Sequence, residues 1–156
     1  VGRRLAKELG LKFLDIDDLI EKEAGLPIKE IFRVNGEASF RRTESEVIAK
    51  LSSGLFGRGI VLSTGGGAVV DPLNRKRLKA WGALICLRAS VDEILRRVGG
   101  REDRPLLSGP DKKEAVERLL AEREEAYADA DFTVDTTGAK IEEVVEKIKA
   151  FLEQAG

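Results

Sequence analysis

The sequence lacks several residue types, and each absence excludes a class of site. It has no histidine and no methionine, and only one cysteine, Cys86. Without histidine, Ser-His pairs, Cys-His pairs and histidine-bound metals are excluded within these residues. One cysteine can form neither an internal disulfide bond nor a cysteine-rich zinc site. Because no apolar run approaches about 18 residues, we expect no membrane span.

An excess of charge of one sign is missing as well. The 156 residues include 27 lysines and arginines and 28 aspartates and glutamates, which leaves a net charge of −1. A general nucleic-acid or membrane-surface binder needs a basic excess, so we expect neither kind of partner. At roughly 100–200 residues per domain, the length predicts a single domain over residues 1–156. A helical pattern already under way at Val1 and the missing start methionine lead us to expect an N-terminus further upstream.

Short apolar runs alternate with helical patterns along the chain. The predicted strands are residues 11–16, 60–63, 83–87 and 132–134. The predicted helices are residues 1–9, 17–24, 27–34, 37–53, 71–81, 90–98, 111–127 and 141–152. Continuous apolar strands between helices predict an α/β fold with a parallel sheet covered by helices on both faces. Ligands of such sheets bind beyond the carboxyl ends of the strands, so the residues after each strand are the first candidates.

Two carboxylates, Asp15 and Asp17, close the first predicted strand. Residues two apart on a strand point to the same face, so the two carboxylates need a cation or a hydrogen-bond donor close by. One interpretation is an acid linked to magnesium beside a carboxylate that faces a substrate hydroxyl. The other is that one of the acids caps the helix that follows.

Three consecutive glycines, Gly65, Gly66 and Gly67, follow the second strand. Without side chains their backbone N–H groups can approach an anion or an oxygen-rich ligand, although a flexible turn is the alternative. Arg41 lies within a helix and is predicted to be free to bind a carboxylate bidentately. A lone arginine on a helix, such as Arg41 or Arg123, is however usually a surface residue.

The segment of residues 99–110 is rich in glycine, proline and arginine and includes Arg104. An irregular segment of this length in an otherwise compact chain favours a lid over an ordinary surface loop. An arginine on a closing lid can neutralise charge on a transferring phosphoryl group.

Four segments of the chain resemble shikimate kinase in their order and spacing. They are residues 13–17 (FLDID), 40–44 (FRRTE), 64–68 (TGGGA) and 104–107 (RPLL). The resemblance covers the whole chain and implies the fold of a small P-loop kinase, similar to nucleoside-monophosphate kinases. It also implies transfer of the γ-phosphate of ATP to the 3-hydroxyl of shikimate, in aromatic amino-acid biosynthesis.

The resemblance also implies roles for individual residues around shikimate. Asp17 would contact the hydroxyls and act as catalytic base or orienter, and Arg41 and Arg123 would hold the carboxylate. The remaining residues that it places around shikimate are Phe32, Phe40, Gly65, Gly66 and Gly67. Helices within about residues 17–53 would form the substrate-binding part.

On the nucleotide side, the resemblance implies ATP and Mg2+ as cofactors. Arg97 would stack near adenine, Arg104 would reach the phosphates and substrate from the lid at residues 99–110, and Asp15 would support magnesium through water. We expect a cytoplasmic monomer whose partners are shikimate and ATP.

The sequence departs from the family in one respect, because the phosphate loop G-x-x-x-x-G-K-[ST] and the strand before it are absent from these residues. Three interpretations stay open: the segment precedes Val1 in the full molecule, the protein is truncated, or the protein lacks the loop. In the last case it would be a non-catalytic shikimate-binding module. A kinase for another small polyol acid, such as gluconate, is a further alternative.

Overall fold

The computed structural model describes residues 1–98 and 112–155. Its helices are α1 (Gly2–Leu9), α2 (Ile16–Ala24), α3 (Ile28–Ser52), the 3-10 turn η1 (Ala68–Val70), α4 (Pro72–Trp81), α5 (Val91–Val98), α6 (Lys112–Ala128) and α7 (Ile141–Ala155). Its strands are β1 (Lys12–Asp15), β2 (Ile60–Ser63), β3 (Ile85–Arg88) and β4 (Phe132–Asp135). These elements follow the predicted order, and no described helix is long and apolar enough to cross a membrane.

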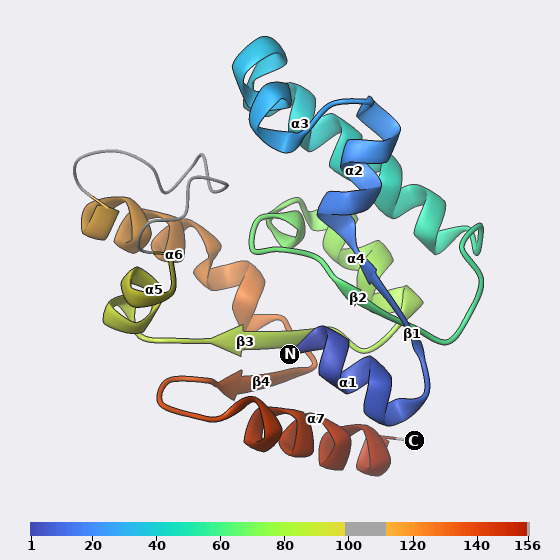
Figure 1. Cartoon of the computed structure of the whole chain (residues 1–156), viewed down its shortest axis with the longest axis vertical. Helices are drawn as coiled ribbons and strands as arrows, with labels where there is room; N and C mark the ends of the chain where they lie inside the picture. Colours follow the sequence, from blue (N-terminus) through green and yellow to red (C-terminus); the bar gives the residue numbers. More distant parts are fainter. Residues whose placement is uncertain (99–111, 156) are drawn as a thin grey trace.

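The four strands pair in parallel, as predicted, but two by two. β1 pairs with β2 from Lys12 opposite Ile60 to Asp15 opposite Ser63. β3 pairs with β4 in the same sense, and no strand ladder joins β2 to β3 in the described part of the chain. The helical crossovers from β1 to β2 and from β3 to β4 each return the chain beside the strand it left (Figure 1). The connection from β2 through η1 and α4 to β3 does not, so the expected single sheet is present as two pairs.

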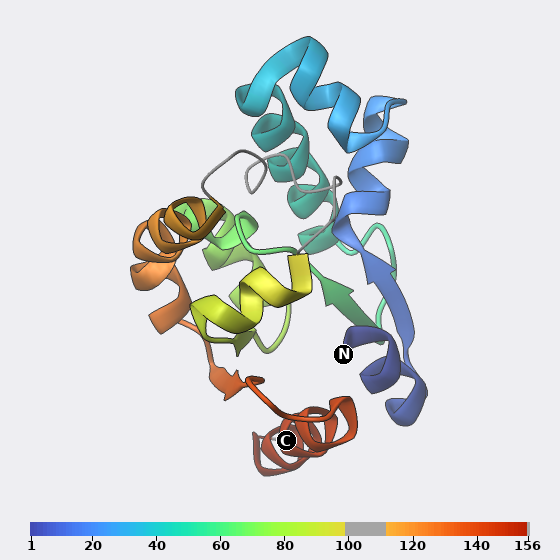
Figure 2. The ribbon, with the colours of Figure 1, turned by 60° about the vertical axis from the view of Figure 1, so that its left-hand side comes forward.

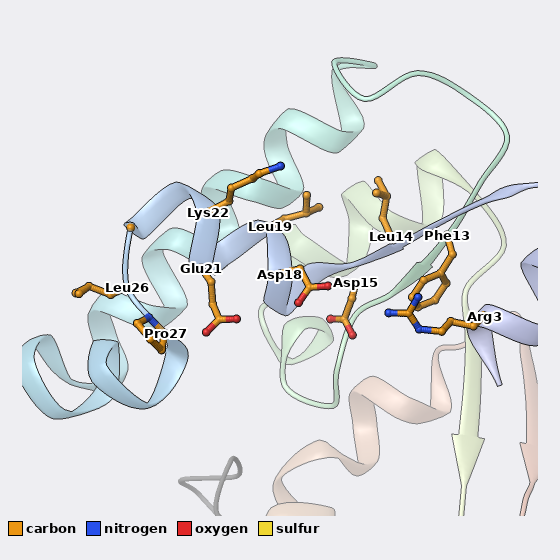
Figure 3. A pocket seen from close by; sticks show the side chains of 11 residues that line it. Arg3, Phe13, Leu14, Asp15, Asp18, Leu19, Glu21, Lys22, Leu26 and Pro27 are labelled. Carbon is orange, nitrogen blue, oxygen red and sulfur yellow. The ribbon is translucent and has the colours of Figure 1, made fainter.

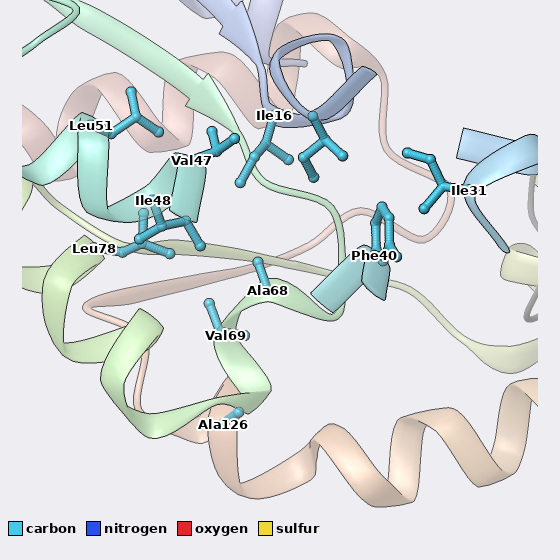
Figure 4. Close-up of a cluster of buried hydrophobic side chains, with 11 residues drawn as sticks. Ile16, Ile31, Phe40, Val47, Ile48, Leu51, Ala68, Val69, Leu78 and Ala126 are labelled. Carbon is cyan, nitrogen blue, oxygen red and sulfur yellow. The ribbon is translucent and has the colours of Figure 1, made fainter. Parts of the chain in front are cut away.

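Helices cover both faces of the strands, which confirms the predicted layering. Leu14 of β1 and Leu62 of β2 pack against a larger apolar cluster. Its buried members come from α2, α3, η1, α4 and α6 (Figure 4). Val61 and Val134 pack on the other side into a smaller cluster with α1 and α7. Figure 2 shows α1 and α7 together on one side of the strands, away from α2 and α3. Successive side chains of a strand point to opposite faces, so β2 contributes Leu62 to the larger cluster and Val61 to the smaller one.

Local signals fix the helix boundaries. The Asp71 carboxylate accepts the Leu73 amide at 2.8 Å and Pro72 occupies the first helical position, as the sequence predicts for α4. Gly36, with φ 81° and ψ 174°, interrupts α3 between the two helices predicted at residues 27–34 and 37–53. The break turns the first part of α3 away from the second.

Candidate active site

Asp15 and Asp17 lie at the junction of β1 and α2. The prediction that both carboxylates lie on the strand is wrong. β1 ends at Asp15, which is the N-cap of α2, and its carboxylate accepts the Asp17 amide at 2.9 Å. Asp17 is exposed in the first helical turn. A hydrogen bond to the helix terminus competes with extension of the strand, so the capping interpretation is the one that holds for Asp15. The positive end of the α2 dipole favours both carboxylates here.

The glycine turn (residues 65–67) follows β2 directly, and its members are glycines for different reasons. Gly65 has φ +72°, a conformation that L side chains rarely adopt. Gly66 and Gly67 have ordinary φ values, so flexibility does not explain them. A Cβ on Gly67 would lie 2.5 Å from both terminal nitrogens of Arg41. Gly67 is therefore bare because an arginine packs on it.

Gly66 is packed in the same way by side chains of α6. A Cβ there would collide with Nη1 of Arg123 and would lie 2.6 Å from the Tyr127 hydroxyl. That hydroxyl donates a hydrogen bond to the Gly66 carbonyl at 2.8 Å. Two arginines from separate helices thus lie against two consecutive glycines. The sequence suggested both arginines and the glycines, but it did not predict Tyr127.

A buried carboxylate, Glu44, stands behind Arg41. Glu44 is only 3% exposed, and its Oε1 accepts from Nη1 of Arg41 at 3.0 Å. Burial raises the pKa of Glu44 above its ordinary value, the Arg41 charge opposes that rise, and the negative charge of Asp17 adds to it. The prediction that Arg41 is free is therefore wrong, because a buried carboxylate holds its Nη1. The spacing of Arg41 and Glu44 by three residues within one helix was the signal that could have revealed the pair.

Tyr127 lies within reach of both arginine charges. Burial raises the pKa of Tyr127 above its ordinary value, and the positive charges of Arg123 and Arg41 oppose the rise. Asp17 and Arg123 in turn both act on the pKa of Glu44. The contacts of Arg41, Arg123 and Tyr127 with the glycine turn bring side chains of α3 and α6 together, although their residues lie far apart in the sequence. We call Arg41, Glu44, Gly66, Gly67, Arg123 and Tyr127 the glycine-turn cluster.

Phe32 and Phe40 lie beside this cluster on α3. Their ring centroids are 4.9 Å apart with the rings tilted by 40°. The Arg41 guanidinium carbon lies 5.2 Å from the centroid of Phe40, close enough for a cation–π contact. Phe40 is buried and Phe32 half-buried, so the pair provides apolar surface next to a charged group.

Arg97 lies elsewhere, at the end of α5, and is bound to the turn after β4. Its Nη1 donates to the Thr136 hydroxyl at 3.0 Å, Nη2 to the Thr136 carbonyl at 3.1 Å, and Nε to Glu93 at 2.9 Å. Thr136 is buried, and its hydroxyl donates to the Arg88 carbonyl at the end of β3. We call Glu93, Arg97 and Thr136 the β4-turn tether. Arg104 and the expected lid at residues 99–110 lie outside the described residues.

A pocket of about 580 Å³ opens beside β1 and α2 (Figure 3). Of the residues singled out from the sequence, only Asp15 lines it, together with Asp18, Glu21 and Arg3. In Figure 3 the three carboxylates lie along one side of α2 and the guanidinium of Arg3 lies near Asp15. No group of three or more His, Cys, Asp or Glu side chains that could hold a metal occurs among the described residues.

Comparison with known proteins gives one consistent family. A family model described as shikimate kinase matches residues 1–153. The chain is 46% identical to the shikimate kinase of Geobacter sulfurreducens over 154 residues, covering 99% of this chain and 83% of that protein. It is 44% identical over 153 residues to the shikimate kinase of Francisella tularensis subsp. novicida, covering 97% of this chain and 86% of the relative.

Solved structures agree with this result. Shikimate kinase from Acinetobacter baumannii in complex with shikimate superposes with a TM-score of 0.92 at 34% identity, over 99% of this chain and 85% of that one. Shikimate kinase from Aquifex aeolicus gives a TM-score of 0.80 at 35% identity, over 97% of this chain and 87% of the other. The similarity therefore extends from sequence to three-dimensional arrangement.

Proposed function

The chain belongs to the shikimate kinase family, and from this premise we propose which of its residues hold each part of the substrates. The activity is ATP-dependent phosphorylation of shikimate: the γ-phosphate of ATP passes to the 3-hydroxyl in the shikimate pathway of aromatic amino-acid biosynthesis. Phosphoryl transfer requires little covalent chemistry from the protein, because alignment and neutralisation of charge carry most of the rate enhancement. Each assignment below is therefore a role in binding, alignment or proton transfer.

Arg41 and Arg123 hold the shikimate carboxylate in this proposal. The supporting observation, which carries the whole assignment, is that both guanidinium groups lie against consecutive glycines of the turn after β2. A guanidinium binds a carboxylate through two parallel hydrogen bonds, and the bare turn leaves room for the substrate to approach. Glu44 holds Arg41 from behind at 3.0 Å. Phe32 and Phe40 supply the apolar wall for the cyclohexene ring.

Asp17 is the proposed catalytic base or orienter for the 3-hydroxyl. It lies in the first turn of α2, exposed, and its charge reaches Glu44 in the glycine-turn cluster. An exposed carboxylate near the arginines that bind the substrate can accept the hydroxyl proton as the oxygen attacks phosphorus. Together with the glycine turn, Asp17 would fix the hydroxyl face of shikimate while the arginines fix its carboxylate.

Asp15 is the residue we assign to magnesium, through water. One of its carboxylate oxygens accepts the Asp17 amide, which leaves the other for a bound water. Magnesium in kinases is held by one or two carboxylates together with substrate phosphates and waters, so a single carboxylate fits this ion although the described residues offer no larger cluster. The ion would neutralise the phosphate charge.

Arg97 and Arg104 complete the nucleotide side of the proposal. Arg97 would stack near adenine, and Arg104, from the lid at residues 99–110, would reach the phosphates. Each of the three nitrogens of the Arg97 guanidinium donates to Glu93 or Thr136, and its planar face is left for a base. We further propose a cytoplasmic monomer without nucleic-acid or membrane partner, in line with the balanced charge.

The test is release of ADP by the purified protein from ATP and magnesium, with shikimate, with gluconate and with no acceptor. We expect release that depends on shikimate alone. Measuring the shikimate KM and the ATP KM separately in variants of Arg123 and Asp17 then tests the residue roles. Release with gluconate, or shikimate binding without release, would favour the two alternative functions instead.

A further inference from the structure

We propose that Tyr127 is a positioning residue for shikimate binding, which orients the backbone of the glycine turn and locates the guanidinium of Arg123. This inference rests on the proposed assignment of Arg123 and the glycine turn to the substrate carboxylate. Tyr127 is neither part of that assignment nor one of the residues that the sequence patterns indicate.

The first observation is the hydrogen bond from the Tyr127 hydroxyl to the Gly66 carbonyl, 2.8 Å long and joining residues 61 positions apart. The aromatic ring is packed against the larger apolar cluster, so the hydroxyl is held by a side chain with little freedom of its own. A bond made by a packed ring fixes the turn relative to α6. A turn with three glycines has much backbone freedom to lose, and this contact restricts it.

The second observation concerns the peptide that joins Gly66 to Gly67. Every described peptide bond is trans, so the Gly66 carbonyl and the Gly67 N–H point in opposite directions within one plane. When Tyr127 holds the carbonyl toward α6, the N–H is directed away from α6. Tyr127 therefore decides which way a backbone donor of the glycine turn is aimed.

The third observation is the crowding over Gly66. The space that a Cβ would occupy there is taken by both Nη1 of Arg123 and the Tyr127 hydroxyl. Arg123 and Tyr127 lie one helical turn apart on α6, so their side chains share a face and contact the glycine turn together. Loss of the hydroxyl would release the turn and remove one of the two groups between which the Arg123 guanidinium packs, the other being Gly66.

The experiment is Tyr127→Phe, which removes one oxygen and keeps the packed ring. We expect the shikimate KM to rise roughly tenfold, the equivalent of one well-placed hydrogen bond, with the ATP KM unchanged. A residue that only stabilised the fold would lower the melting temperature without separating the two KM values. An unchanged shikimate KM, or an equal rise in both constants, overturns the proposal.

Two controls separate this inference from the assignment beneath it. Ser53→Ala removes another hydroxyl-to-carbonyl bond, 2.7 Å to Lys50 at the end of α3, and should leave both constants unchanged. Arg123→Ala should raise the shikimate KM. If it does and Tyr127→Phe does not, the Tyr127 inference alone fails; if Arg123→Ala has no effect, the carboxylate assignment fails and the inference falls with it.

A spectroscopic measurement on the unmodified protein gives an independent test. Tyr127 is the only tyrosine in the chain, so the tyrosine absorbance reports on this site alone. Titration with shikimate in the absence of ATP should produce a tyrosine difference spectrum that saturates with substrate binding and disappears in Tyr127→Phe. A saturated protein that shows no tyrosine signal contradicts the proposed role of Tyr127 in shikimate binding.

Discussion

The glycine-turn cluster and the β4-turn tether hold their arginines in different ways. Arg41 donates from Nη1 to the buried Glu44, lies 3.5 Å through Nε from Glu37, and rests on a bare glycine, so among the described residues one terminal nitrogen stays available to a ligand. Arg97 donates from all three of its nitrogens to protein acceptors and keeps 43% of its side chain exposed. The first arrangement suits hydrogen bonds to an anion, and the second suits stacking on a planar ring. The number of donors that the protein itself uses thus indicates which kind of ligand each arginine can take.

The largest effect is expected from a residue in neither region. Asp17→Asn should reduce kcat by a factor on the order of 10²–10⁴, because the amide cannot accept the hydroxyl proton, while ATP binding persists. Rates of ADP release and direct ATP titration measure the two quantities. Near wild-type turnover in this variant would mean that Asp17 is not the catalytic base or orienter.

Gly66→Ala should weaken shikimate binding roughly thirtyfold, since the new methyl group displaces Arg123 and the Tyr127 hydroxyl together. Gly65→Ala is the matched control, because its Cβ meets nothing within 4 Å but its φ of +72° strains an L residue. The control should cost about 1 kcal/mol of unfolding free energy with a smaller change in shikimate affinity. Equal effects of the two variants on shikimate affinity would show that packing against Arg123 is not the reason why position 66 requires glycine.

Arg97→Ala should raise the ATP KM roughly tenfold and leave the shikimate KM unchanged. Arg97→Lys sharpens the comparison, because lysine keeps the charge but has no planar face. If stacking is the role, the lysine variant should be nearly as impaired as the alanine variant. A lysine variant with wild-type ATP KM would show that Arg97 acts by charge, and the distinction between the two regions would disappear.

Glu44→Gln should give the smallest effect, a rise of roughly threefold in the shikimate KM, because glutamine still accepts from Arg41 but lacks the charge. The stability of the wild type should also depend on pH. Burial raises the pKa of Glu44, so the folded state holds this proton more tightly than the unfolded chain does. Its contribution is complete below the ordinary value of 4.5 and is lost as the pH rises through the raised pKa.

The measurement is the melting temperature of wild type and Glu44→Gln across the acidic to neutral range. Relative to the variant, the wild type should gain stability as the pH falls. A difference between the two proteins that does not vary with pH would contradict the raised pKa. The glycine-turn cluster would then hold an ordinary ion pair rather than a strongly desolvated one.

The elements themselves were largely predictable from the sequence. Asp71 and Pro72 predicted the start of α4, and Gly36 lies between the two helices predicted within α3. Strand ends were less well predicted, because β1 stops at Asp15, where a side chain caps the next helix. The Asp15 carboxylate could face a ligand or cap the next helix, and the local sequence pattern alone could not distinguish the two.

Within the candidate site, the sequence indicated several of the residues but not which side chains they contact. The sequence pointed to Arg41, Arg123 and the glycine turn, and missed Glu44 and Tyr127. Glu44 is one of 28 acidic residues, and its spacing from Arg41 indicates a pair but not the burial that distinguishes it. Tyr127 has no local pattern that links it to Gly66, since the two residues meet only when α6 lies across the turn after β2.

The sequence by itself determined where helices and strands begin, which faces are apolar and which family the motifs resemble. These properties depend on side-chain periodicity and on caps that act over a few residues. Tertiary structure alone decided that the Glu44 carboxylate beside Arg41 is buried, that Gly66 and Gly67 are bare because arginines pack on them, and that Tyr127 holds the turn. Each of these depends on contacts between segments far apart in the chain, and burial and electrostatic coupling arise only when such segments exclude water together.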